Sequence, residues 1–119
     1  NTIEDYVFML YITGEPAQFD HLRSICEVVI EFKSDHVDFL TYPAMTYDAL
    51  EDYEAGIAYL KNAEVLHPNN AMVSLLIAEN YENRGMINAA LAYYRKPVRH
   101  GKEDDAKEAV GHIERLTFR

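Results

Sequence analysis

The feature that most constrains the fold of this chain is an internal repeat with a period of 34 residues. Small and aromatic residues recur at that interval: Ala44, Tyr47, Ala55, Ala58 and Tyr59 return as Ala78, Tyr81, Ala89, Ala92 and Tyr93. A segment that recurs in this way is a small structural unit that cannot bury its apolar face alone. The chain is therefore expected to stack similar units, each covering the apolar face of its neighbour.

Helical periodicity runs through almost the whole chain, because apolar residues recur at three- and four-residue steps. Helices are predicted at 3–12, 16–32, 36–50, 52–66, 70–84, 88–96 and 103–117. Asn69 or Asn70 is expected to cap the fifth helix. Pro43 is expected to delay or kink the third helix, and Pro97 to weaken the end of the sixth. With short connections and no convincing period-two stretch, the prediction is an all-α chain of about seven antiparallel helices.

Two successive units, 37–70 and 71–104, carry small, aromatic and apolar residues in a recurring helix-turn-helix pattern. In the second unit these are Ile77, Ala78, Tyr81, Gly85, Ala90 and Tyr94, and in the first Ala44, Tyr47, Gly56, Leu60, Ala63 and Pro68. This pattern resembles the tetratricopeptide repeat family. The resemblance implies an α-α solenoid in which small residues let paired helices approach closely, while Tyr47 and Tyr81 fill the wedge between them.

The remaining segments fit the same organisation less closely. Residues 3–36 lack the small residues at the matching offset and are interpreted as a degenerate helix pair. Residues 103–119 are interpreted as a C-terminal capping helix, with Ala106, Ala109, Val110, Ile113 and Leu116 on one face and Lys107, Glu108, His112, Glu114 and Arg115 largely on the other. Residues 1–119 are thus expected to form a single domain. The alternative that these residues are a fragment of a longer chain stays open.

The charge balance restricts the class of partner. With 20 acidic and 11 basic residues the net charge is −9, which opposes binding to a nucleic-acid backbone. The apolar runs are too short to span a bilayer, and no signal peptide is visible, so a soluble and cytoplasmic protein is favoured over an exported one. A basic protein or peptide is compatible with this charge.

Residues that carry catalytic chemistry are scattered, so the protein is predicted not to be an enzyme and to need no cofactor. Cys26 lies among apolar residues and is interpreted as a buried thiol. Asp35, His36 and Asp38 lie close enough to bind a cation loosely, but Ser34 or Asp35 acting as a helix cap is the favoured interpretation. No metal site is therefore predicted.

The function implied by the resemblance is protein binding in a concave groove lined by the first helix of each pair. The candidate partner-binding residues in that groove are Asp38, Thr41, Met45, Asp48, Met72, Leu75, Glu79, Glu82 and Asn83. Carboxylates beside Met and Leu side chains suit a partner segment that carries Lys or Arg next to apolar residues. The chain is accordingly expected to be a noncatalytic interaction module or scaffold.

A second functional hypothesis is structural. The first helix carries Tyr6, Phe8, Met9, Leu10, Tyr11 and Ile12, which cover more than one face. A helix that is apolar nearly all round is normally buried. The alternative function is therefore an oligomerisation or structural domain that packs through this helix against another copy, forming a homo-oligomer, or against further repeats of a parent chain.

Overall fold

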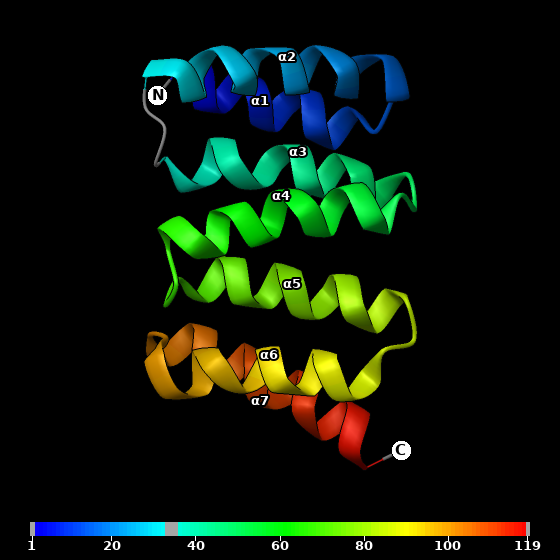
Figure 1. Ribbon diagram of the computed structural model, residues 1–119, viewed down its shortest axis with the longest axis vertical. Coiled ribbons are helices and arrows are strands. Elements are labelled where there is room, and N and C mark those ends of the chain that lie inside the picture. Colours follow the sequence, from blue (N-terminus) through cyan, green and yellow to red (C-terminus); the bar gives the residue numbers. More distant parts are fainter. Residues whose placement is uncertain (1, 33–35, 119) are drawn as a thin grey trace. The chain divides into compact units, whose positions relative to one another are not determined.

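The computed structural model describes residues 2–32 and 36–118, and these residues form seven helices and no strand (Figure 1). The helices are α1 (Thr2–Thr13), α2 (Pro16–Phe32), α3 (Val37–Ala49), α4 (Tyr53–Leu66), α5 (Ala71–Asn83), α6 (Ile87–His100) and α7 (Glu103–Thr117). The predicted all-α class is confirmed.

Both predictions about where a proline limits its helix are wrong, whereas the alternative that Pro43 kinks its helix stays a prediction. Pro43 does not delay α3, which begins at Val37, and α6 continues past Pro97 to His100. A proline inside a helix removes one backbone hydrogen bond. Both prolines are buried, which indicates that packing offsets this loss. The last turn of α6 also keeps a bond from the Gly101 N–H to the Pro97 carbonyl, at 2.7 Å.

The predicted cap of the fifth helix is confirmed at Asn70. Its side-chain oxygen accepts a hydrogen bond from the Val73 N–H at 3.1 Å. An N-cap of this kind satisfies one of the amide groups that the first turn of a helix leaves unpaired. The proposed capping by Ser34 or Asp35 concerns positions outside the described residues. His36 occupies the N-cap of α3 and makes no side-chain capping bond.

By internal packing the chain divides into an N-terminal unit (Asn1–Ala63) and a C-terminal unit (Glu64–Arg119), with the boundary inside α4. In the N-terminal unit α1 and α2 form an antiparallel pair, and both pack against α3 (Figure 1). The core of this unit contains Val7, Leu10, Leu22, Cys26 and Phe39.

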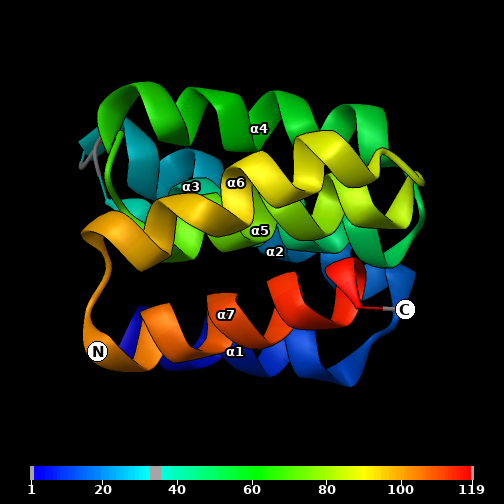
Figure 2. The same cartoon turned by 90° about the horizontal axis from the view of Figure 1, so that it is seen from below.

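In the C-terminal unit α6 packs against both α5 and α7 (Figure 2). Its core contains Leu75, Ala78, Ala90, Tyr94, Ala109 and Leu116. The predicted outer face of the last helix is partly wrong, because two of its members turn toward α5 and α6. The ring of His112 stacks on Tyr94 at 4.6 Å, and Arg115 forms an ion pair with Glu82.

The 34-residue period reappears in the buried positions. In α3 and α5 the buried residues are Phe39, Leu40, Thr41, Pro43, Ala44 and Thr46, matched by Val73, Ser74, Leu75, Ile77, Ala78 and Asn80. In α4 and α6 they are Gly56, Leu60 and Ala63, matched by Ala90, Tyr94 and Pro97. Every buried position of one helix pair is therefore buried in the other.

The aromatic contacts repeat as well. Tyr47 packs on Tyr59 with ring centroids 5.7 Å apart, and Tyr81 packs on Tyr93 at 5.8 Å. Close packing of the first pair depends on Gly56, because a Cβ atom there would lie 3.3 Å from the Ala44 carbonyl oxygen and would collide with the Asp48 side chain. This agrees with the expected role of small residues.

The N-terminal helix pair follows the same period with larger side chains. Val7, Leu10, Leu22 and Cys26 are buried, and they precede Thr41, Ala44, Gly56 and Leu60 by one period. Leucine thus stands where the next pair has alanine and glycine. The loss of small residues explains why a comparison of sequence alone finds this pair only weakly similar to the others.

Candidate functional site: an apolar groove between α1 and α2

Exposed apolar side chains are concentrated on α1. Five of its twelve residues are large, apolar and exposed, namely Ile3, Tyr6, Phe8, Met9 and Ile12. Val7 and Leu10 alone among its residues are buried, so the helix uses one narrow stripe for the core. The expectation that apolar residues occupy more than one face of this helix is therefore confirmed, and many of these apolar side chains are exposed to solvent.

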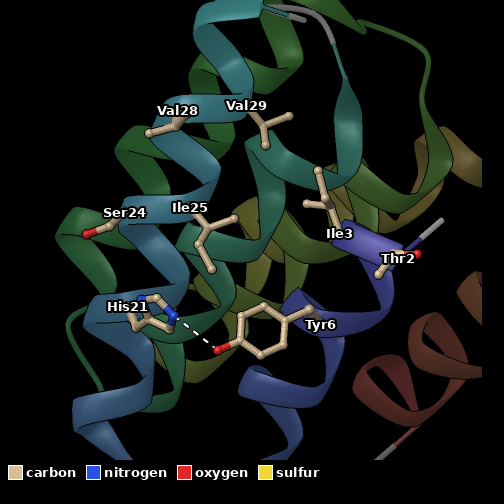
Figure 3. Close-up of a pocket in the computed structure, with 8 residues that line it drawn as sticks. All are labelled: Thr2, Ile3, Tyr6, His21, Ser24, Ile25, Val28 and Val29. Atoms are coloured by element: carbon tan, nitrogen blue, oxygen red, sulfur yellow. Dashed lines mark hydrogen bonds between the residues drawn. The ribbon is translucent and has the colours of Figure 1, made fainter.

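A groove of about 530 Å³ lies between α1 and α2 (Figure 3). Its lining consists of Thr2, Ile3 and Tyr6 from α1, and His21, Ser24, Ile25, Val28 and Val29 from α2. One end is polar, because the Tyr6 hydroxyl and His21 Nε2 lie 3.1 Å apart in a hydrogen bond. The other side chains in Figure 3 offer mainly aliphatic carbon, so the groove suits an apolar ligand with one polar group.

Acidic residues border this groove on α2. Asp20, Glu27 and Glu31 are exposed and follow one helical stripe together with Ser24, immediately beside the lining residues His21 and Val28. Across residues 1–32 the sequence has six carboxylates and one arginine. The apolar groove is therefore set in an acidic surround.

The arginine of this segment, Arg23, is engaged in internal contacts. Its guanidinium pairs with Asp20, donates to the Thr46 hydroxyl at 2.9 Å and lies 4.4 Å from the centre of the Tyr47 ring. These contacts join α2 to α3. They also leave the acidic character of the surface only partly balanced.

The groove residues predicted from the sequence fall in both units, and each set is described by itself. In the N-terminal unit Asp38, Met45 and Asp48 are half-buried. Thr41 is buried, and its hydroxyl donates to the Val37 carbonyl at 3.0 Å. The prediction that Thr41 offers a surface to a partner is therefore wrong.

In the C-terminal unit Met72 and Asn83 are exposed and Glu79 is half-buried. Leu75 is part of the core beside Ala109 and Leu116, so it offers no contact surface, contrary to the prediction. Glu82 accepts hydrogen bonds from Tyr94 and from both terminal nitrogens of Arg115, at 2.7–2.8 Å. These contacts hold the pKa of Glu82 below its ordinary value, with the Arg115 bonds as the largest cause. Glu82 therefore serves the packing of α7.

A mixed cluster of ligand-type side chains lies where α1 and α3 meet. Oxygen atoms of Glu4 and Asp38 and a ring nitrogen of His36 lie within 4.8 Å of one another. Glu4 Oε1 is 2.9 Å from His36 Nε2. Sequence reasoning found His36 and Asp38 but missed Glu4, because it lies 32 residues earlier and only the packing of α1 on α3 brings it close.

Cys26 is fully buried in the N-terminal core, as predicted. Burial raises the pKa of its thiol to about 12, with a smaller contribution from the Glu27 carboxylate. A thiol of this kind stays protonated at neutral pH and is a poor nucleophile. In the described parts of the chain, each helix is also too short or too polar to cross a lipid bilayer.

A comparison with protein-family models and a comparison with curated proteins each returned no match. The resemblance to tetratricopeptide repeats thus rests on the internal period and on the residues that carry it.

Proposed function

We propose that this protein is a noncatalytic scaffold that binds an amphipathic helical segment of a basic partner protein in the α1–α2 groove. The observation that carries this proposal is the group of exposed apolar side chains on α1 next to an apolar groove with an acidic border. Apolar patches rimmed by polar residues are typical of protein interaction sites. The fold adds no direct argument, because helical repeat proteins serve many functions.

The chemistry of the partner follows from the surface. A helix that places apolar side chains on Ile3, Ile25 and Val28 would bring its flanking residues close to Asp20, Glu27 and Glu31. Lysine and arginine at those flanking positions complement the carboxylates, whereas acidic residues are repelled. A helix as long as α1 extends about 18 Å at 1.5 Å per residue, so a partner segment of about three turns fills the groove.

A second copy of the chain is a less suitable occupant. A symmetric dimer sets the same surface patch of both subunits face to face. The carboxylates of Asp20, Glu27 and Glu31, which border the groove, would then be brought close to the same carboxylates of the second copy. This repulsion distinguishes a basic partner from self-association.

The proposal is tested with two fluorescent helical peptides that share a leucine face and differ only in having lysine or glutamate on the flanks. Fluorescence anisotropy measures their binding. The lysine peptide is expected to bind, and the glutamate peptide is expected to bind at least tenfold more weakly. Binding of the lysine peptide should be lost in the double variant Ile3→Ser/Val28→Ser, whose substitutions change exposed groove residues without opening the core.

The matched control is Val65→Ser, which removes an exposed valine from α4 outside the groove and should leave binding unchanged. Equal binding by the double variant, or equal binding of both peptides, would refute the proposal. Sedimentation of the protein alone provides a second check: a dimer that dissociates on Ile3→Ser/Val28→Ser would assign the groove to a second copy instead.

A further inference from the structure

The Glu4–His36–Asp38 cluster has the donor set of a transition-metal site. It combines one imidazole and two carboxylates. Glu4 belongs to α1, Asp38 belongs to α3, and His36 directly precedes α3. These donors suit Zn²⁺, which binds histidine nitrogen at about 2.0–2.1 Å and carboxylate oxygen at about 2.0–2.2 Å. We propose that the protein binds one Zn²⁺ ion through Glu4, His36 and Asp38.

The separations of the donor atoms support this assignment. Two ligands at these bond lengths in tetrahedral geometry lie about 3.4 Å apart. Glu4 Oε1 and His36 Nε2 are 2.9 Å apart, so a shift of about half an ångström lets both reach one ion. The third donor, a carboxylate oxygen of Asp38, lies within 4.8 Å of the others, so the proposed site requires this side chain to move closer when the ion binds.

The other ring nitrogen of His36, Nδ1, is not a ligand in this arrangement. This atom is buried and has no hydrogen-bond partner among the described residues. Buried polar atoms are nearly always satisfied, so an ordered water is expected to bond to this nitrogen and to fix the orientation of the ring. The side chains of His36 and Glu4 are 27% and 34% exposed, so an ion reaches the cluster from solvent.

The ligand set also predicts selectivity and a structural effect. Mg²⁺ and Ca²⁺ prefer oxygen donors, whereas imidazole favours zinc and its transition-metal neighbours. With three protein ligands, the fourth position is filled by water. Because Glu4 belongs to α1 and Asp38 to α3, the ion ties the first helix of the unit to the third. Zinc binding should therefore stabilise the N-terminal unit.

The experiment titrates ZnCl₂ into the chelator-treated protein by calorimetry and follows thermal unfolding in parallel. One equivalent of Zn²⁺ is expected to bind and to raise the Tm by roughly 5 °C or more at saturating metal. In proton NMR spectra the ring signals of His36 should shift first among the five histidines. EDTA should reverse all three effects.

The test variants are His36→Gln, Glu4→Gln and Asp38→Asn, and the control is His100→Gln, which changes an exposed histidine outside the cluster. Each test variant is expected to bind zinc at least tenfold more weakly, with an unchanged far-UV circular dichroism spectrum, and the control to bind like the natural protein. Equal zinc binding by His36→Gln and Glu4→Gln would overturn the proposal. An equal rise in Tm with MgCl₂ or CaCl₂ would do so as well, because it would show that the histidine is not a ligand.

Discussion

At the scale of single residues, the two repeat units differ most clearly where their first helices end. α3 and α5 both close with the same backbone bond: the Asp52 N–H donates to the Tyr47 carbonyl at 2.8 Å, and the Met86 N–H donates to the Tyr81 carbonyl at 2.9 Å. This turn needs one residue in the left-handed region. Gly85 provides it in one unit with φ at +76°, whereas Glu51 adopts +62° in the other.

Glu51→Gly is therefore expected to stabilise the protein. The left-handed conformation costs a residue with a side chain roughly 1 kcal/mol of folding free energy, which glycine avoids. Glycine also gives the unfolded chain more conformational freedom, and this offsets part of the stabilisation. The expected net increase in the free energy of unfolding is about 0.5 kcal/mol, measured by urea denaturation.

The matched control is Gly85→Ala, at the equivalent position one period later. A Cβ atom there meets nothing within 4 Å, so its effect is purely conformational. Alanine is expected to reduce the free energy of unfolding by about 1 kcal/mol. If Glu51→Gly were destabilising while Gly85→Ala behaved as expected, the side chain of Glu51 would have to contribute more than the strain costs.

At the scale of helices, the last helix is held by a polar network as well as by its apolar face. Glu82 of α5 receives bonds from Tyr94 of α6 and Arg115 of α7, so one carboxylate joins all three helices of the C-terminal unit. Tyr94 is fully buried, and burial together with its bond to Glu82 raises the pKa of its hydroxyl. The carboxylate must be ionised to accept all of these bonds.

Glu82→Gln is accordingly expected to reduce stability at neutral pH and to do so in a pH-dependent way. Loss of the charged acceptor costs about 1–2 kcal/mol at pH 7. The pKa of Glu82 is lower in the folded protein than the usual value of 4.5, so its contribution is complete above that value and disappears as the pH falls through the folded pKa.

The measurement is urea denaturation of both proteins between pH 7 and pH 3. The difference in free energy of unfolding should be constant down to about pH 5 and shrink below it. A difference that stays constant down to pH 3 would show that the charge of Glu82 does not matter. The variant Lys107→Gln is a suitable control, because it removes an exposed pair with Glu103 that contributes little.

The sequence predicted the helices well because their apolar periodicity is local. The ends of α1 and α7 agree with the expected ranges within one residue. It failed at Pro97, where local preference opposes a helix but the proline itself is buried and the helix continues to His100. It also failed at His112 and Arg115, since the partners of these residues lie far away in the chain.

The candidate sites were harder to predict for the same reason. The apolar excess of the first helix was visible in the sequence, but the groove also needs the α2 stripe that runs through Ile25 and Val28. Thr41 and Leu75 occupy equivalent positions one period apart, and both are buried, so helical periodicity alone did not distinguish a contact surface from a core position.

At the scale of the whole molecule, the excess of acidic residues governs the response to salt. The net charge of −9 produces self-repulsion in the folded state, which dissolved ions screen. The screening length falls from about 30 Å at 0.01 M salt to about 8 Å at 0.15 M. The ion pairs Arg23–Asp20, Lys96–Glu64, Lys107–Glu103 and Arg115–Glu82 are at least partly exposed, so the stability that these pairs lose through screening is small.

The Tm is therefore expected to rise by roughly a few degrees as the NaCl concentration increases from 0.01 to 0.15 M. Glu27→Gln/Glu31→Gln provides the control, because it removes two exposed like charges one helical turn apart and changes the net charge from −9 to −7. This variant should have a higher Tm at low salt and a smaller response to NaCl. A Tm that falls with salt would mean that attractive pairs outweigh the repulsion.

The same salt range should weaken binding of a lysine-bearing helix to the α1–α2 groove, since attraction to the acidic border is screened by the same ions.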